Sequence, residues 1–194
     1  MFIKNWKTDV FTIPNFLSMF RLLLIPVYVV IYLNAEEPFE YILAGTILAV
    51  SCLTDMIDGK VARHFNMISN VGKILDPIAD KATQFAMILC LSMKHPVLWL
   101  VLGLFILKEG FQLVVGVIHL RKGQMLTGAL MVGKICTTVL FVSLIAMVLF
   151  PQMSRVTVAV IAAVNTVFLI ASFVGYFRAY YGNNIQVEDL NQNR

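Results

Sequence analysis

The chain has 194 residues, of which 59% are hydrophobic and only 13% are charged. A soluble domain of this length carries about twice that charged fraction, so the composition excludes an ordinary soluble protein and indicates an integral membrane protein. The net charge of +4 does not call for a nucleic-acid partner, because basic residues beside the cytoplasmic ends of membrane spans account for it.

Residues 1–13 mix aromatic and charged side chains, which leaves two alternatives open: a short amphipathic helix in the headgroup region, or a disordered start. Apolar runs follow, each near the roughly 20 residues that a spanning helix needs. A polar tail, residues 182–194, ends the chain. We predict an all-α integral membrane fold with six transmembrane helices, in a single domain of residues 1–194. The six runs are about Phe16–Leu33, Phe39–Ile57, Ile74–Met93, Val97–Leu120, Leu130–Phe150 and Val156–Tyr176.

Basic residues concentrate on one side of this predicted bundle. They occur before the first run, between the second and third, between the fourth and fifth, and after the sixth, whereas the other connections are poor in Lys and Arg. The positive-inside rule then places both termini, and the connection after the second run, in the cytoplasm. We expect a multi-pass protein in the bilayer of the cell membrane, that is, the inner or plasma membrane.

Four aspartates lie within 26 positions, where the second predicted helix ends and the third begins. Asp55 and Asp58 are three residues apart, and Asp76 and Asp80 are four apart, so each pair projects from one face of its helix. A carboxylate near hydrocarbon costs at least roughly 2.5–3.5 kcal/mol, which favours a bound cation. Carboxylate oxygens suit Mg²⁺ or Mn²⁺. The sequence therefore predicts a metal centre at the end of the bundle.

The aspartates belong to a longer pattern, D-x2-D-G-x2-A-R-x8-G-x3-D-x3-D. This pattern resembles the signature of the CDP-alcohol phosphotransferase (CDP-alcohol phosphatidyltransferase) family. The opening Ile13–Ser18, with Arg21 and Pro26, is similar to the start of that family's first helix. Leu75–Lys81 and the pair Gly133-Lys134 are similar to its phosphatidylglycerophosphate synthase and cardiolipin synthase branch. The family's fixed positions are filled by Asp55, Asp58, Gly59, Ala62, Arg63, Gly72, Asp76 and Asp80.

The resemblance implies an enzyme that transfers a phosphatidyl group from a CDP-linked lipid to an alcohol and releases CMP. It further implies two divalent ions, held by Asp55, Asp58, Asp76 and Asp80, with Asp80 also acting as the base on the acceptor hydroxyl. Two such ions suit an in-line displacement at phosphorus because they stabilise the entering and leaving oxygens. The resemblance also implies a homodimer. The implied CDP-binding residues are Asp58, Gly59, Ala62, Arg63 and Gly72.

The acceptor is the least determined part of this interpretation. A phosphorylated acceptor needs basic partners, although a lysine or arginine near a helix end also snorkels to the interface. The fourth helix departs from the family pattern, since Lys108-Glu109-Gly110 stands where phosphatidylglycerophosphate synthases carry Arg-Glu-Phe. The basic candidates inside the apolar runs are Lys81, Lys134, Lys108 and Arg21.

We expect a transferase that uses CDP-diacylglycerol and glycerol 3-phosphate to form phosphatidylglycerophosphate. The alternative within the family is a cardiolipin synthase that uses phosphatidylglycerol as the acceptor. A non-catalytic membrane protein that binds or transports cations is the alternative from another class. A further alternative for the aspartates is a structural ion-pair network with Arg63, Lys73 and Lys81.

Overall fold

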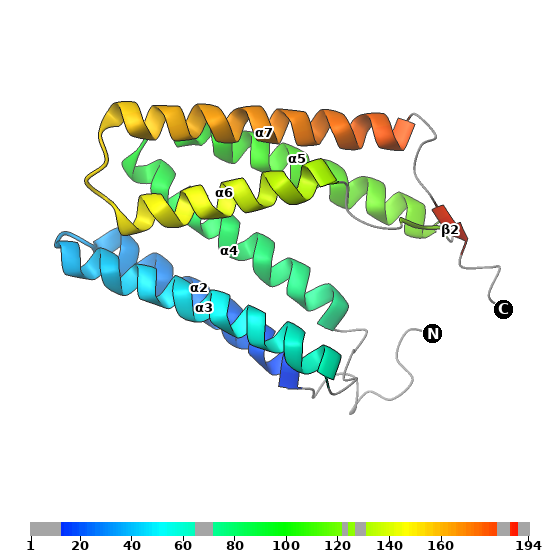
Figure 1. Cartoon of the computed structure of the whole chain (residues 1–194), viewed down its shortest axis with the longest axis horizontal. Helices are drawn as coiled ribbons and strands as arrows, with labels where there is room; N and C mark the ends of the chain where they lie inside the picture. Colours follow the sequence, from blue (N-terminus) through cyan, green and yellow to red (C-terminus); the bar gives the residue numbers. More distant parts are fainter. Residues whose placement is uncertain (1–12, 65–71, 122–123, 127–130, 182–186, 190–194) are drawn as a thin grey trace. The chain divides into compact units, whose positions relative to one another are not determined.

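The computed structural model describes residues 13–64, 72–121, 124–126, 131–181 and 187–189. Helices account for nearly all of the described residues (Figure 1). Each helix coincides with one predicted apolar run, so the helical prediction is confirmed. The predicted interfacial segment lies, except for Ile13, outside the described residues. The helices are α2 (Ile13–Asn34), α3 (Pro38–His64), α4 (Gly72–Lys94), α5 (Leu98–Arg121), α6 (Met131–Leu149) and α7 (Arg155–Tyr181).

Two short strands complete the described structure and were not expected. The strand β1 (Gln124–Leu126) pairs antiparallel with β2 (Val187–Asp189), so that Gln124 faces Asp189 and Leu126 faces Val187. The strand β2 belongs to the tail, residues 182–194, that the sequence predicts as polar. A ladder of three residues is too short to leave an alternating pattern, and its partner is distant in sequence, so composition does not reveal it.

Side-chain caps fix the start of two helices. Glu40 accepts hydrogen bonds from the backbone N–H groups of Glu36 at 2.6 Å and Glu37 at 3.1 Å, ahead of Pro38 at the first position of α3. This arrangement satisfies N–H groups that have no partner within the helix. Ser154 Oγ accepts a hydrogen bond of 3.1 Å from the N–H of Thr157 and caps α7 in the same way.

The helix α2 has its polar side chains inside and its apolar side chains outside. Asn15, Ser18 and Arg21 are buried, whereas Phe16 and Leu23 are 71% and 67% exposed. In water this arrangement would be unfavourable, because a soluble helix buries its apolar face. It is favourable in a bilayer, where lipid tails contact the apolar face and polar groups need partners inside the protein.

Four helices in the described part are long and apolar enough to cross a membrane, which agrees with a multi-pass membrane protein. The other two, α3 and α4, are less apolar. Among the residues of α3 whose side chains are described, Pro38–Thr54 form an apolar stretch, and α4 carries Asp76, Asp80 and Lys81 within its first half. The prediction of six spans is thus only partly matched, and in α4 the charged residues lower the hydropathy of the helix. The four spans are Asn15–Asn34, Leu98–Ile118, Met131–Leu149 and Arg155–Tyr181.

The chain divides into two compact units, Met1–Met93 with Ile145–Gln152, and Lys94–Leu144 with Met153–Arg194. In the first unit α2 and α3 lie side by side as a helical hairpin (Figure 1). The helix α4 belongs to the same unit and contacts α2 through polar side chains.

In the second unit α5 packs on α7, and α6 contacts α7. The ring of Phe111 in α5 lies 5.1 Å from that of Phe173 and 5.9 Å from that of Tyr180 in α7, measured between ring centroids. Asn165 of α7 donates a hydrogen bond of 2.8 Å to Ser143 Oγ of α6. A polar contact of this kind between spans is worth about 0.6–2 kcal/mol.

Gly133 allows α6 and α7 to approach closely. A Cβ atom added at Gly133 would lie 2.5 Å from the hydroxyl oxygen and 2.7 Å from a ring carbon of Tyr176. The Tyr176 ring is rigid and buried, so it has little room to move away. An added Cβ at Gly103 of α5, by contrast, meets no atom within 4 Å.

We predict that Gly133→Ala destabilises the protein by about 1–3 kcal/mol, the usual effect of overpacking a close contact. Gly103→Ala is the matched control and should leave the stability unchanged or raise it, because alanine favours a helix by about 1 kcal/mol over glycine. Thermal unfolding in detergent measures both. Equal melting temperatures for the two variants would contradict the close contact at Gly133.

Candidate functional site

A row of polar residues runs along the buried side of α2. Asn15, Ser18 and Arg21 are spaced three residues apart, so they follow one face of the helix. All three are at most 2% exposed. We call them the α2 polar face. Burying an arginine in a membrane protein is unfavourable unless it has charged or polar partners, so we expect this face to contact such groups.

The α2 polar face contacts the second aspartate pair, in α4. Ser18 Oγ donates a short hydrogen bond to Asp76 Oδ1. Arg21 Nη1 donates to Asp80 Oδ1 at 2.7 Å, and Arg21 Nη2 lies 3.8 Å from Asp76 Oδ1. The planar guanidinium therefore spans both carboxylates through its two terminal nitrogens. These partners are 58 and 59 residues apart in sequence.

The charges at this contact differ sharply in their exposure. The side chains of Asp76 and Asp80 are 42% and 50% exposed, whereas the side chain of Arg21 is only 3% exposed. The carboxylates thus lie at the surface of the bundle with a buried cation behind them. Two like charges four residues apart on a helix repel each other, and Arg21 offsets this repulsion from the inside.

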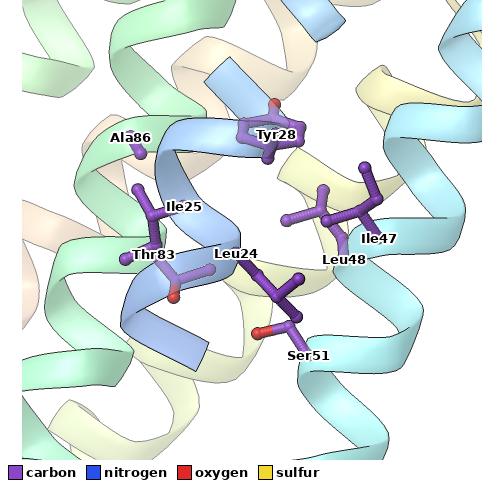
Figure 2. Close-up of a pocket in the computed structure, with 8 residues that line it drawn as sticks. All are labelled: Leu24, Ile25, Tyr28, Ile47, Leu48, Ser51, Thr83 and Ala86. Carbon is purple, nitrogen blue, oxygen red and sulfur yellow. The ribbon is translucent and has the colours of Figure 1, made fainter. Parts of the chain in front are cut away.

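A small apolar slot lies next to the aspartates between α2, α3 and α4, and Figure 2 shows the side chains that line it. Its volume is about 10 Å³, roughly enough for one water molecule and far too small for a lipid chain. Tyr28 lines the slot, and its buried hydroxyl has no hydrogen-bond partner among the described residues. A packed, mostly apolar layer therefore bounds the site on this side. The lining residues are Leu24, Ile25, Tyr28, Ile47, Leu48, Ser51, Thr83 and Ala86.

The residues that line the slot also show where the aspartates lie along their helices. Leu24, Ser51 and Thr83 line it from α2, α3 and α4. One helical turn closer to the end of the unit at which α3 has its C-terminus, the same three helices carry Arg21, Asp55 and Asp80, respectively. The backbone of α3 continues as a helix through Asp58 to His64. The backbone is therefore compatible with the prediction that the two pairs meet at one end of these helices.

Most of the predicted CDP and metal residues have side chains outside the described part of the structure. Among the residues whose side chains are described, no group of three or more His, Cys, Asp or Glu lies close enough to hold a metal ion. Of the two aspartate pairs, only Asp76 and Asp80 are among the described side chains. The predicted residues whose side chains lie outside the described part are Asp55, Asp58, Gly59, Ala62, Arg63 and Gly72.

The predicted acceptor-binding residues have different surroundings. Lys81 follows Asp80 and is half-buried, and Arg21 is engaged with the aspartates. Lys108 and Lys134 belong to the second unit. Lys108 is buried at 4% exposure and its Nζ lies 2.7 Å from Glu109 Oε1, whereas Lys134 is exposed. Lys108 and Glu109 thus form a local charged pair within α5.

The sequence of the chain also matches a family of known proteins. Residues 11–174 match the family model described as CDP-alcohol phosphatidyltransferase, which covers most of the chain. This chain belongs to the CDP-alcohol phosphatidyltransferase family. The family predicted from the aspartate pattern is thereby confirmed.

Curated members of the CDP-alcohol phosphatidyltransferase family fall into both predicted branches. A cardiolipin synthase (CMP-forming) of Streptomyces coelicolor is 36% identical over 135 residues, which are 68% of this chain and 62% of the relative. A probable phosphatidylglycerophosphate synthase of Mycobacterium tuberculosis is 29% identical over 173 residues, 87% of this chain and 80% of the relative. A CDP-diacylglycerol–glycerol-3-phosphate 3-phosphatidyltransferase of Rickettsia bellii is 36% identical over 86 residues, 44% and 46% of the two chains.

Proposed function

We propose that this protein transfers a phosphatidyl group from CDP-diacylglycerol to glycerol 3-phosphate, releasing CMP and forming phosphatidylglycerophosphate. The observation that carries the proposal is the pair of half-exposed carboxylates, Asp76 and Asp80, held against α2 by a buried arginine. Membership of the family supports the reaction type. Relatives named for the glycerol-3-phosphate reaction support the acceptor.

The residues at this site fit divalent ions such as Mg²⁺ or Mn²⁺. Hard cations prefer carboxylate oxygens, and Asp76 and Asp80 present such oxygens at the bundle surface. We propose that Asp55, Asp58, Asp76 and Asp80 together hold two ions. Bound there, the ions would offset the negative charge that builds up on the oxygens around phosphorus.

The roles of the chain's own residues follow from their chemistry. We propose that Asp80 takes the proton from the acceptor hydroxyl, because a carboxylate beside the reacting alcohol is a suitable general base. Arg63 provides a planar set of donors for the diphosphate of the CDP group. Gly59, Ala62 and Gly72 have small side chains or none, which allows a nucleotide to approach the backbone. Asp58 completes the proposed CDP site.

The membrane arrangement is part of the same proposal. We propose that α3 and α4 also cross the bilayer, which gives six spans in a single domain and places both termini and the aspartates at the cytoplasmic side of the cell membrane. The basic connections support this orientation. A site at that boundary allows a membrane lipid and a soluble phosphate ester to meet. We further propose a homodimer, as the family resemblance implies.

Cardiolipin synthesis, with phosphatidylglycerol as the acceptor, is the second candidate. The match to the Streptomyces coelicolor cardiolipin synthase favours it. The acceptor phosphate in either reaction needs cationic partners. Lys81 is a candidate because it directly follows Asp80 in the sequence. Lys134, Lys108 and Arg21 remain the other predicted acceptor residues.

The product of the reaction tests the proposal directly. Purified protein receives CDP-diacylglycerol, Mg²⁺, glycerol 3-phosphate and phosphatidylglycerol together, and mass spectrometry identifies the lipid formed. We predict phosphatidylglycerophosphate. Removing the divalent ions with a chelator should stop CMP release, and adding Mg²⁺ back should restore it. Cardiolipin as the product would favour the second candidate, and no CMP from either acceptor would contradict the proposed enzyme.

The assignment of the base predicts the effect of Asp80→Asn. Asparagine keeps the size of the side chain but accepts no proton, so CMP release should fall by about 10²–10⁴-fold. Asp189→Asn, in the strand β2, is the control and should keep its activity. Size-exclusion chromatography verifies that both variants are folded. Wild-type turnover by Asp80→Asn would exclude Asp80 as the base.

A further inference from the structure

Arg21 is a buried cation in a mostly apolar helix. Its side chain is 3% exposed, and α2 is among the helices long and apolar enough to span a membrane. An ionised group in such a place is retained only with partners, and it marks a function more often than a structural need. The described partners of Arg21 are the two acids of the proposed metal centre.

We propose that Arg21 is a positioning residue for the second aspartate pair, and that it acts together with Ser18. The guanidinium fixes the Asp80 carboxylate through Nη1, while Ser18 and Nη2 fix Asp76. This inference rests on the proposed function, in which Asp76 and Asp80 are metal ligands and Asp80 is also the base. It gives Arg21 a role other than binding the acceptor phosphate.

The exposure of the groups favours positioning over substrate binding. A ligand that arrives from the surface reaches Asp76 and Asp80, which are 42% and 50% exposed, before it reaches the buried guanidinium. To bind a phosphate, Arg21 would have to leave both carboxylates and move outward past them. Holding them requires no movement.

The chemistry of arginine matches this role better than that of lysine. A guanidinium presents several N–H donors in a rigid planar fork, so two carboxylates can be held at a fixed separation. An ammonium is a point charge on a flexible stem and fixes no such geometry. Three contacts from α2, one from Ser18 and two from Arg21, are made to the Oδ1 atoms of these acids.

Steady-state kinetics distinguish a positioning role of Arg21 from a role in binding the acceptor. Removing a positioning residue lowers kcat, whereas removing a group that binds the acceptor in its ground state raises the acceptor KM. For Arg21→Met we expect kcat to fall by about 10–100-fold, the usual effect of losing a residue that holds a metal ligand in place. The acceptor KM should stay within about twofold of wild type. Arg21→Lys keeps the charge without the fork and should recover only part of kcat. Arg155→Met, at an exposed arginine of α7, is the matched control.

A stability cycle tests the contact without relying on activity. Melting temperatures in detergent, without metal or substrate, are measured for Arg21→Met, Asp80→Asn and the double variant. Each single change removes the ion pair between Arg21 and Asp80, and the double variant loses that pair only once, so it should be less destabilised than the sum of the two single changes. The same cycle with Arg155→Met in place of Arg21→Met is the control and is expected to be additive.

The outcomes separate this inference from the proposed function. A raised acceptor KM with unchanged kcat in Arg21→Met, or additive melting shifts in the Arg21–Asp80 cycle, would overturn the positioning role. If Arg21→Met does not fold, Arg21→Lys undergoes the same kinetic test, and an increase in its acceptor KM alone would be equally contradictory. If the wild-type protein releases no CMP, the proposed function fails while the stability cycle still reports on the contact.

Discussion

The contact between a buried arginine in α2 and two aspartates in α4 is the constraint on which the candidate site depends. Asp76 and Asp80 share one face of α4 and would repel each other. Arg21, behind them, offsets that charge and links the two helices through residues that are 59 positions apart in sequence. Ser18 adds a hydrogen bond to Asp76. The same contact thereby stabilises the helix packing and orients the acids that we propose to be catalytic.

The bilayer explains why such a contact lies inside the bundle. Lipid offers no hydrogen-bond partners, so polar side chains of a span must find them within the protein. The helix α2 follows this rule along its length, with Phe16 and Leu23 facing outward and Asn15, Ser18 and Arg21 facing inward. The slot around Tyr28 and Leu48, whose lining includes Thr83 one helical turn after Asp80, has a volume of only about 10 Å³. The polar site is therefore confined to one end of these helices, which suits a reaction between a membrane lipid and a soluble substrate.

The sequence was sufficient to predict the helices and the family. Apolar runs of the right length predict all six described helices, and the spacing of the aspartates led to the family that residues 11–174 match. It did not predict that Arg21 and Ser18 meet Asp76 and Asp80, because that contact depends on how α2 is rotated toward α4. The spacing of Asn15, Ser18 and Arg21 was the available signal, a polar face on an apolar helix. The pairing of β1 with β2 left no signal in three residues, and the acceptor remains a proposal because its basic candidates are dispersed along the chain.

The most direct test of this account is an anomalous difference map from crystals of the full-length protein soaked in Mn²⁺. We predict two manganese peaks, one or both contacting Asp76 and Asp80, with Asp55 and Asp58 completing the ligands and Arg21 still bonded to Asp80. No peak at the aspartates, or ions bound elsewhere in the bundle, would contradict a two-metal centre built on these four residues.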